Sequence, residues 1–93
     1  MVTCVVPKRP RINDPDRERL LEHRRQLVGA RIRELRLARD LSQESLALES
    51  GLSRDHVIQM EHGRRGLMVE LIYDIAGVLG VAASELIPDD GAR

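Results

Sequence analysis

Two short segments, each preceded by a serine and followed by a glycine, constrain the fold of this chain more than any other feature. The first lies between Ser42 and Gly51, and the second lies between Ser53 and Gly63. A serine side chain accepts hydrogen bonds from the free N–H groups at a helix start, and glycine adopts the left-handed conformation that ends a helix. The pattern predicts two short helices joined by a tight turn. They span Gln43 to about Ser50 and Arg54 to His62.

Apolar residues within these segments define an inner side for each predicted helix. Leu46 and Ala47 face inward in the first helix, and Val57 and Met60, three residues apart, face inward in the second. Two helices that cross steeply need a small residue where their backbones approach, and Ala47 supplies it. The outer side of the second helix is polar and can form hydrogen bonds. Its residues are Arg54, Asp55, His56, Gln59 and His62.

A longer helix precedes this pair. Asp14 suits the N-cap, Pro15 suits the first helical position, and apolar residues at helical spacing continue to about Arg39. Gly29 lies inside this helix and either divides it in two or is accommodated within it. The pattern predicts an extended first helix.

The rest of the chain completes a single domain. Helical apolar spacing predicts two further helices at residues 69–79 and 82–87, and no alternating β-branched run indicates a strand. We therefore expect an all-α fold of five short helices over residues 14–87. A basic arm at residues 1–13 precedes it, and a polar tail at 88–93 follows it.

Charge is distributed unevenly although the net charge is zero. Residues 1–39 contain eleven Lys and Arg against five Asp and Glu, a balance of +6, and residues 40–93 contain four against ten, a balance of −6. This asymmetry permits a positive face toward phosphate groups. The alternative is that the two halves neutralise each other in space.

The residues that carry a family resemblance lie in and around the helix pair. They read R-I-R-E-L-R at 31–36, L-S-Q-E-S-L-A at 41–47, G-L-S at 51–53 and I-A-x-x-L-G-V at 75–81, with Val57, Met60, Glu61 and Gly63. This pattern resembles the Cro/C1-type (XRE-like) helix-turn-helix family over roughly residues 27–87. The resemblance implies a lambda-repressor-like domain that binds double-stranded DNA.

The polar side of the second short helix is expected to enter the major groove. Arg54 and Gln59 are assigned to base contacts, because arginine binds guanine and glutamine binds adenine through two hydrogen bonds each. Asp55 either accepts from a cytosine amino group or holds Arg54 in place. Gln43 resembles the family glutamine that contacts the DNA backbone. Further backbone contacts are expected from Ser53, His56, His62 and Arg64.

Two further sets of charged residues have predicted roles. Arg36 and Glu61 resemble an ion pair with which the family ties its first and third helices together, a structural role. Lys8, Arg9 and Arg11 form a basic arm that either enters an adjacent minor groove or remains a solvated tail.

Enzymatic and membrane functions are not indicated. The chain has no glycine-rich phosphate loop after a strand and no nucleophile at a recognised spacing from a base, so we expect no enzyme. Its three histidines are scattered and Cys4 is the only cysteine, so we expect no metal or other cofactor. No stretch near 18 apolar residues occurs, which predicts a cytoplasmic, nucleoid-associated protein.

A single recognition helix reads few base pairs, which predicts a homodimeric repressor on a pseudo-palindromic operator. The candidate subunit contacts are the last helix, the extended first helix, and Leu67 with Met68, which are otherwise core residues. Three alternatives stay open: an antitoxin with a toxin partner, a restriction-modification controller, and an adaptor that has lost DNA binding and contacts another protein regulator. The acidic second half and Asp55 are compatible with the adaptor.

Overall fold

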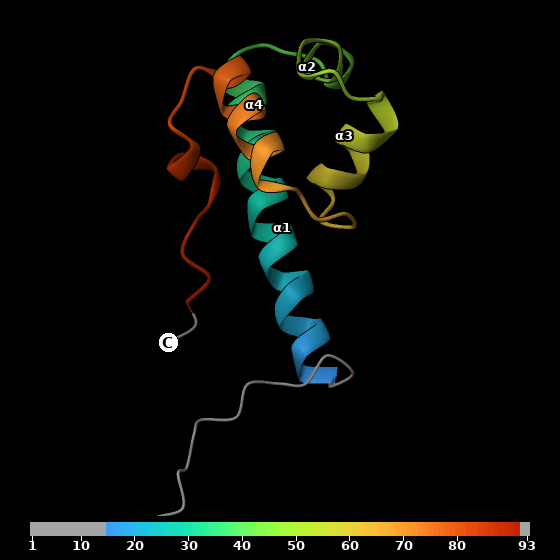
Figure 1. Ribbon diagram of the computed structural model, residues 1–93, viewed down its shortest axis with the longest axis vertical. Coiled ribbons are helices and arrows are strands. Elements are labelled where there is room, and N and C mark those ends of the chain that lie inside the picture. The colour runs from blue at the N-terminus through green and yellow to red at the C-terminus, as the bar shows by residue number, and fades with distance from the viewer. Residues whose placement is uncertain (1–14, 92–93) are drawn as a thin grey trace, which may run out of the picture.

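A computed structural model describes residues 15–91, which form four α-helices and one 3₁₀ turn (Figure 1). The all-helical class is confirmed, and no β-strand occurs within this range. The expectation of five helices was wrong, because the last segment forms only a 3₁₀ turn. The elements are α1 (Pro15–Ala38), α2 (Gln43–Ser50), α3 (Arg54–Glu61), α4 (Val69–Leu79) and η1 (Ala83–Leu86).

The last element is short because the residues after it disfavour an α-helix. The N–H of Glu85 donates to the carbonyl of Ala82 at 2.9 Å, and the N–H of Ile87 donates to that of Ser84 at 3.3 Å. Both bonds have the three-residue spacing of a 3₁₀ turn. Pro88 has no N–H group and disfavours helical backbone at the residue before it. The predicted helix therefore ends after one turn.

α1 continues without a break through Gly29, so the alternative of a divided helix was wrong. Gly29 is buried, and a Cβ atom there would lie 2.3 Å from the carbonyl oxygen of Met60 and 2.8 Å from that of Glu61. The end of α3 thus rests directly on the α1 backbone. The glycine allows this close helix contact and does not interrupt the helix.

The serine caps and the glycine turn of the central pair are as predicted. Ser42 Oγ accepts a hydrogen bond from the N–H of Ser45 at 2.9 Å, and Ser53 Oγ accepts one from the N–H of His56 at 3.0 Å. Gly51 between the helices has a φ of 73°, in the left-handed region. Ser42 and Gly51 thus fix where α2 begins and ends, and Ser53 fixes where α3 begins.

A single core joins the helices. In Figure 1, α4 crosses in front of α1, α2 and α3 lie on one side of them, and η1 lies on the other. The first turns of α1 extend beyond the helices that pack against it. Leu67 packs half-buried against the core, whereas Met68 is 71% exposed. The fully buried side chains are Ile32, Leu46, Val57, Met60, Ile75, Leu79 and Leu86.

Candidate nucleic-acid interface

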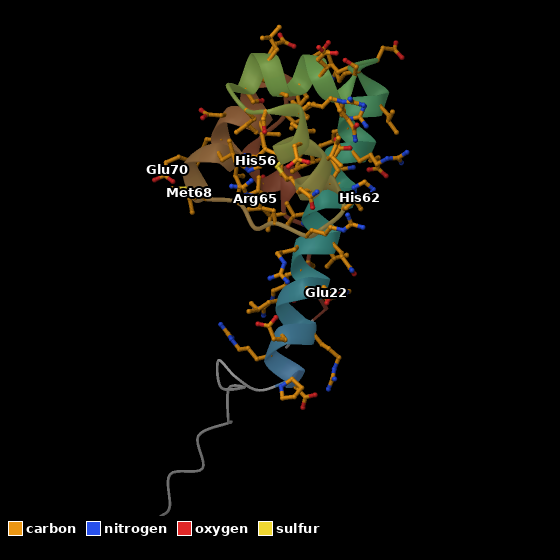
Figure 2. The ribbon with its side chains drawn as sticks, turned by 90° about the vertical axis from the view of Figure 1, so that its right-hand side faces the viewer. Glu22, His56, His62, Arg65, Met68 and Glu70 are labelled. Carbon is orange, nitrogen blue, oxygen red and sulfur yellow. The ribbon has the colours of Figure 1, made fainter. Side chains whose placement is uncertain are left out.

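The outer side of α3 is open to solvent. Val57 and Met60 are fully buried and fix the rotation of this helix about its axis. Arg54 and Asp55 are exposed in the first turn, and Gln59 is half-buried one turn later. Figure 2 views the molecule from this side, with α3 in front of α1. The three residues expected to contact bases therefore lie on the uncovered side of the helix.

A buried ion pair holds α3 to α1. Arg36 Nε donates to Glu61 Oε2 at 2.6 Å and Arg36 Nη2 donates to Glu61 Oε1 at 3.1 Å, so the contact is bidentate. The side chains are only 7% and 1% exposed. Arg36 Nη1 also donates to the carbonyl of Leu41 at 2.7 Å. The pair expected from the sequence is thus present, and its guanidinium also fixes the turn before α2.

Gln43 belongs to the same network. Its side-chain Nε2 donates to Glu61 Oε1 at 3.1 Å, so this half-buried residue links the start of α2 to the end of α3. The sequence assigned Gln43 only to the DNA backbone and gave no sign of this contact. A side chain held in this way loses little conformational freedom when it meets a phosphate group.

A polar hollow of about 430 Å³ lies where α2 begins. The positive end of the α2 dipole and the guanidinium of Arg54 both favour an anion there, while the carboxylate of Glu44 opposes one. This balance suits a phosphate oxygen at the rim of the hollow. The lining residues are Arg36, Ser42, Gln43, Glu44 and Arg54.

Two further cations follow α3. Gly63, with a φ of 72°, turns the chain into a loop where Arg64 and Arg65 are exposed and form no ion pair with any residue of 15–91. Burial lowers the pKa of His56 below its ordinary value of 6.5, the charge of Arg65 lowers it further, and Asp55 opposes both effects. His56 is therefore mainly neutral at pH 7, and the arginines carry the positive charge of this edge.

The other residues expected to contact DNA are two polar residues at the ends of α3 and the residues of the N-terminal arm. Ser53 is exposed and caps α3. His62 is exposed, and its Nδ1 lies 2.8 Å from the carbonyl oxygen of Ile58. Because a carbonyl only accepts, Nδ1 carries the proton and donates to it. The arm residues lie outside the described range, namely Lys8, Arg9 and Arg11.

Comparisons with known proteins identify the family of this domain. Residues 32–86, more than half of the chain, match the sequence profile of the family described as helix-turn-helix. The chain belongs to the helix-turn-helix family. The resemblance drawn from the sequence is thereby confirmed, and so is the expectation of a helix-turn-helix regulator at the level of the family.

Several relatives resemble most of this domain. An uncharacterized HTH-type transcriptional regulator of Sinorhizobium fredii is 38% identical over 63 residues, covering 68% of this chain and 82% of the relative. The control protein C.BamHI of Bacillus amyloliquefaciens is 36% identical over 64 residues, covering 68% and 79%. The crystal structure of the restriction-modification controller protein C.AhdI of Aeromonas hydrophila has a TM-score of 0.68 and 39% identity, covering 71% of this chain and 96% of that one.

Metal binding and membrane insertion concern the same residues. No group of three or more His, Cys, Asp or Glu side chains within 15–91 is placed to hold a metal ion. In the same part of the chain, no helix is both long and apolar enough to span a bilayer. The three relatives named above are regulators and control proteins by name.

Sequence reasoning missed two residues of this region. Arg65 was not among the expected contact residues, although it is an exposed cation beside His56. Gly29 was read as a possible break, although it allows α3 to contact α1. A glycine inside an otherwise strong helical pattern could have signalled a close helix contact, because it is unfavourable there without such a reason.

Proposed function

We propose that this chain is a transcriptional repressor that binds double-stranded DNA as a homodimer, with α3 in the major groove of a pseudo-palindromic operator. The solvent-open polar side of α3 carries the proposal. Arg54 can donate two hydrogen bonds to guanine, and Gln59 can pair with adenine, which are the contacts that distinguish bases in this groove. Asp55 accepts from a cytosine amino group or orients Arg54.

Contacts with the sugar-phosphate backbone of DNA would come from residues at both ends of α3. At its start, Arg54 and Gln43 adjoin the positive end of α2, and at its end Arg64 and Arg65 have no carboxylate partner within the described range. His62 adds an exposed hydrogen-bonding group, and Ser53 and His56 lie near the first turn. Phosphate groups on the two sides of the major groove would meet these two clusters.

Specificity supports a homodimer. α3 has eight residues and can contact only a few base pairs, while each mismatch costs about 1 to 3 kcal/mol against a genome of competing sites. Two subunits related by a twofold axis double the sequence that is read, with half-sites about 34 Å apart. Such a protein would reside on chromosomal DNA in the cytoplasm.

The experiment is a selection of bound fragments from random DNA, followed by fluorescence anisotropy at several salt concentrations. Arg54, Arg64 and Arg65 give six unpaired cations per dimer, so log K should fall against log salt with a slope of about −5. Enriched sequences should show twofold symmetry. Failure of the wild-type protein to retain any DNA would refute the proposal and favour an adaptor or a toxin-bound antitoxin instead.

A second candidate function is control of a restriction-modification system. The likeness to C.BamHI and C.AhdI favours it, because the alignments span 79% and 96% of those two control proteins. Selection of bound fragments from genomic DNA separates the two functions. Enrichment of a promoter beside methyltransferase and endonuclease genes would identify a controller, and enrichment elsewhere would identify a repressor of other genes.

A further inference from the structure

An exposed apolar ridge runs along the start of α4. Met68, Val69 and Tyr73 are 71%, 64% and 66% exposed, and Tyr73 is the only aromatic residue of the chain. Val69 and Tyr73 are four residues apart and therefore lie on the same side of the helix. Adjoining apolar side chains on a small domain indicate a contact surface, whereas isolated ones do not. We call Met68, Val69 and Tyr73 the α4 ridge.

A hollow of about 310 Å³ lies next to this ridge, between α1 and the loop before α4. Its apolar lining comes from both elements. Arg24 and Arg25 also line it. Arg24 Nε donates to Asp90 Oδ2 at 2.6 Å, so the positive charge of the hollow comes from Arg25. The apolar residues, here called the socket, are Leu21, Val28, Leu67 and Ile72.

The acidic residues beside the ridge complement Arg25. Glu70 and Asp74 are exposed, lie next to Val69 and Tyr73 in the chain, and form no ion pair with any residue of 15–91. Arg25 is half-buried, and among residues 15–91 it donates only to the carbonyl of Gly63, at 3.3 Å. Each molecule thus carries an apolar ridge flanked by negative charge and an apolar socket flanked by positive charge.

We propose that the occupant of the socket is the α4 ridge of a second copy of this chain. In a twofold dimer the ridge of each subunit would enter the socket of the other, with Glu70 facing Arg25 of the other copy at both contacts. This inference rests on the proposed homodimer and adds its interface. Leu21, Arg24, Arg25 and Val28 precede residue 32, where the family match begins, so this chain's long α1 supplies half of the socket.

The position of the ridge fits DNA binding by both subunits. In Figure 2, which faces α3, Met68 and Glu70 project at the left edge of the molecule, to the side of α3. A twofold axis through that edge, parallel to the viewing direction, turns the α3 of the second subunit toward the same side. Both recognition helices can then meet one face of a DNA duplex.

The experiment measures the mass of the full chain in solution by sedimentation velocity without DNA, from micromolar to hundreds of micromolar. Glu70→Arg and Arg25→Glu each place like charges together twice per dimer, so each should raise the dimer dissociation constant about tenfold or more. A mixture of the two variants restores opposite charges at both contacts. It should dimerise as well as the wild type, although each variant alone does not.

Apolar variants test the same interface. Tyr73→Asp in the ridge and Leu21→Asp in the socket should each give monomers that still unfold cooperatively by circular dichroism. Leu48→Asp is the matched control, because Leu48 is 80% exposed on α2, away from both surfaces, and its variant should remain dimeric. A monomeric wild type, dimers unaffected by Tyr73→Asp, or a mixture that stays monomeric would overturn the inference.

The outcome also separates this inference from the proposed function. If Tyr73→Asp still binds operator DNA as a dimer with unchanged affinity, the interface is elsewhere and the function stands. If the wild type forms the dimer but retains no DNA, the interface stands and the proposed function fails.

Discussion

Substitution of Arg36 by methionine tests the buried network directly. Methionine keeps much of the side-chain volume but removes the three hydrogen bonds to Glu61 and Leu41. The Glu61 carboxylate, with its side chain 1% exposed, would then retain only the amide of Gln43. Removing one partner of a buried ion pair costs about 3 to 5 kcal/mol, because the other charge stays without compensation.

The loss is large beside the total stability of a small domain, about 5 to 15 kcal/mol. With a urea slope of about 1 to 2 kcal/mol/M, the unfolding midpoint of Arg36→Met should fall by roughly 2 M. Circular dichroism at the helix band is the suitable assay, because the only aromatic residue, Tyr73, is largely exposed and reports little on the core.

A double variant separates charge from packing. Arg36→Met with Glu61→Leu replaces the whole pair by apolar side chains, which is often neutral or stabilising, so it should recover most of the lost stability. The network does not hold α3 as argued if the free energy of unfolding of Arg36→Met lies within about 1 kcal/mol of the wild-type value. The same conclusion follows if the double variant is no more stable than Arg36→Met alone.

Three further predictions concern the helix contact, the DNA contacts and pH. Gly29→Ala should destabilise the domain by about 1 to 3 kcal/mol in urea unfolding despite the better helix propensity of alanine, because its Cβ would overlap the Met60 carbonyl; a gain in stability would contradict this. Arg54→Ala should cost about 1 to 3 kcal/mol of DNA affinity and relax preference at one base position, whereas Gln43→Ala should weaken all sequences alike; equal effects from both on every sequence would contradict these roles. The folded pKa of His56 lies below 6.5, so the unfolded chain binds more protons and stability is lost as pH falls below 6.5; the melting temperature should drop less between pH 7 and 5 in His56→Gln, and parallel curves would exclude this.

The central helix pair could be predicted because its signals are local. Ser42 and Ser53 cap through hydrogen bonds to residues three positions later, and Gly51 needs only its own backbone conformation. The buried Val57 and Met60 followed from helical spacing, which also fixed the outer side of α3. In each case the physical cause lies within one helical turn of the residue.

Features that depend on distant contacts could not be predicted in this way. Gln43 meets Glu61 across 18 residues, and Gly29 meets the end of α3 across more than 30. Asp40, just after α1, has a φ of 56°, which is unusual for a residue other than glycine. The local sequence does not distinguish Gln43 and Asp40 from ordinary polar residues, and the glycine at position 29 signals a close contact without indicating its partner.

The charge asymmetry shows how far composition can mislead about a DNA-binding surface. Much of the positive charge of α1 is neutralised by intramolecular ion pairs. The arginines that each pair with a carboxylate are Arg19, Arg24, Arg31 and Arg36. Arg24 pairs with Asp90 and Arg36 pairs with Glu61, so these two contacts join the basic half to the acidic half. The halves thus partly neutralise each other, one of the two alternatives that the sequence left open. Three of the four arginines in the acidic half lie just at or after the ends of α3 and have no carboxylate partner within the described range. Those three are Arg54, Arg64 and Arg65. Affinity for phosphate groups therefore depends on which cations remain unpaired beside α3, and a chain of zero net charge can supply them.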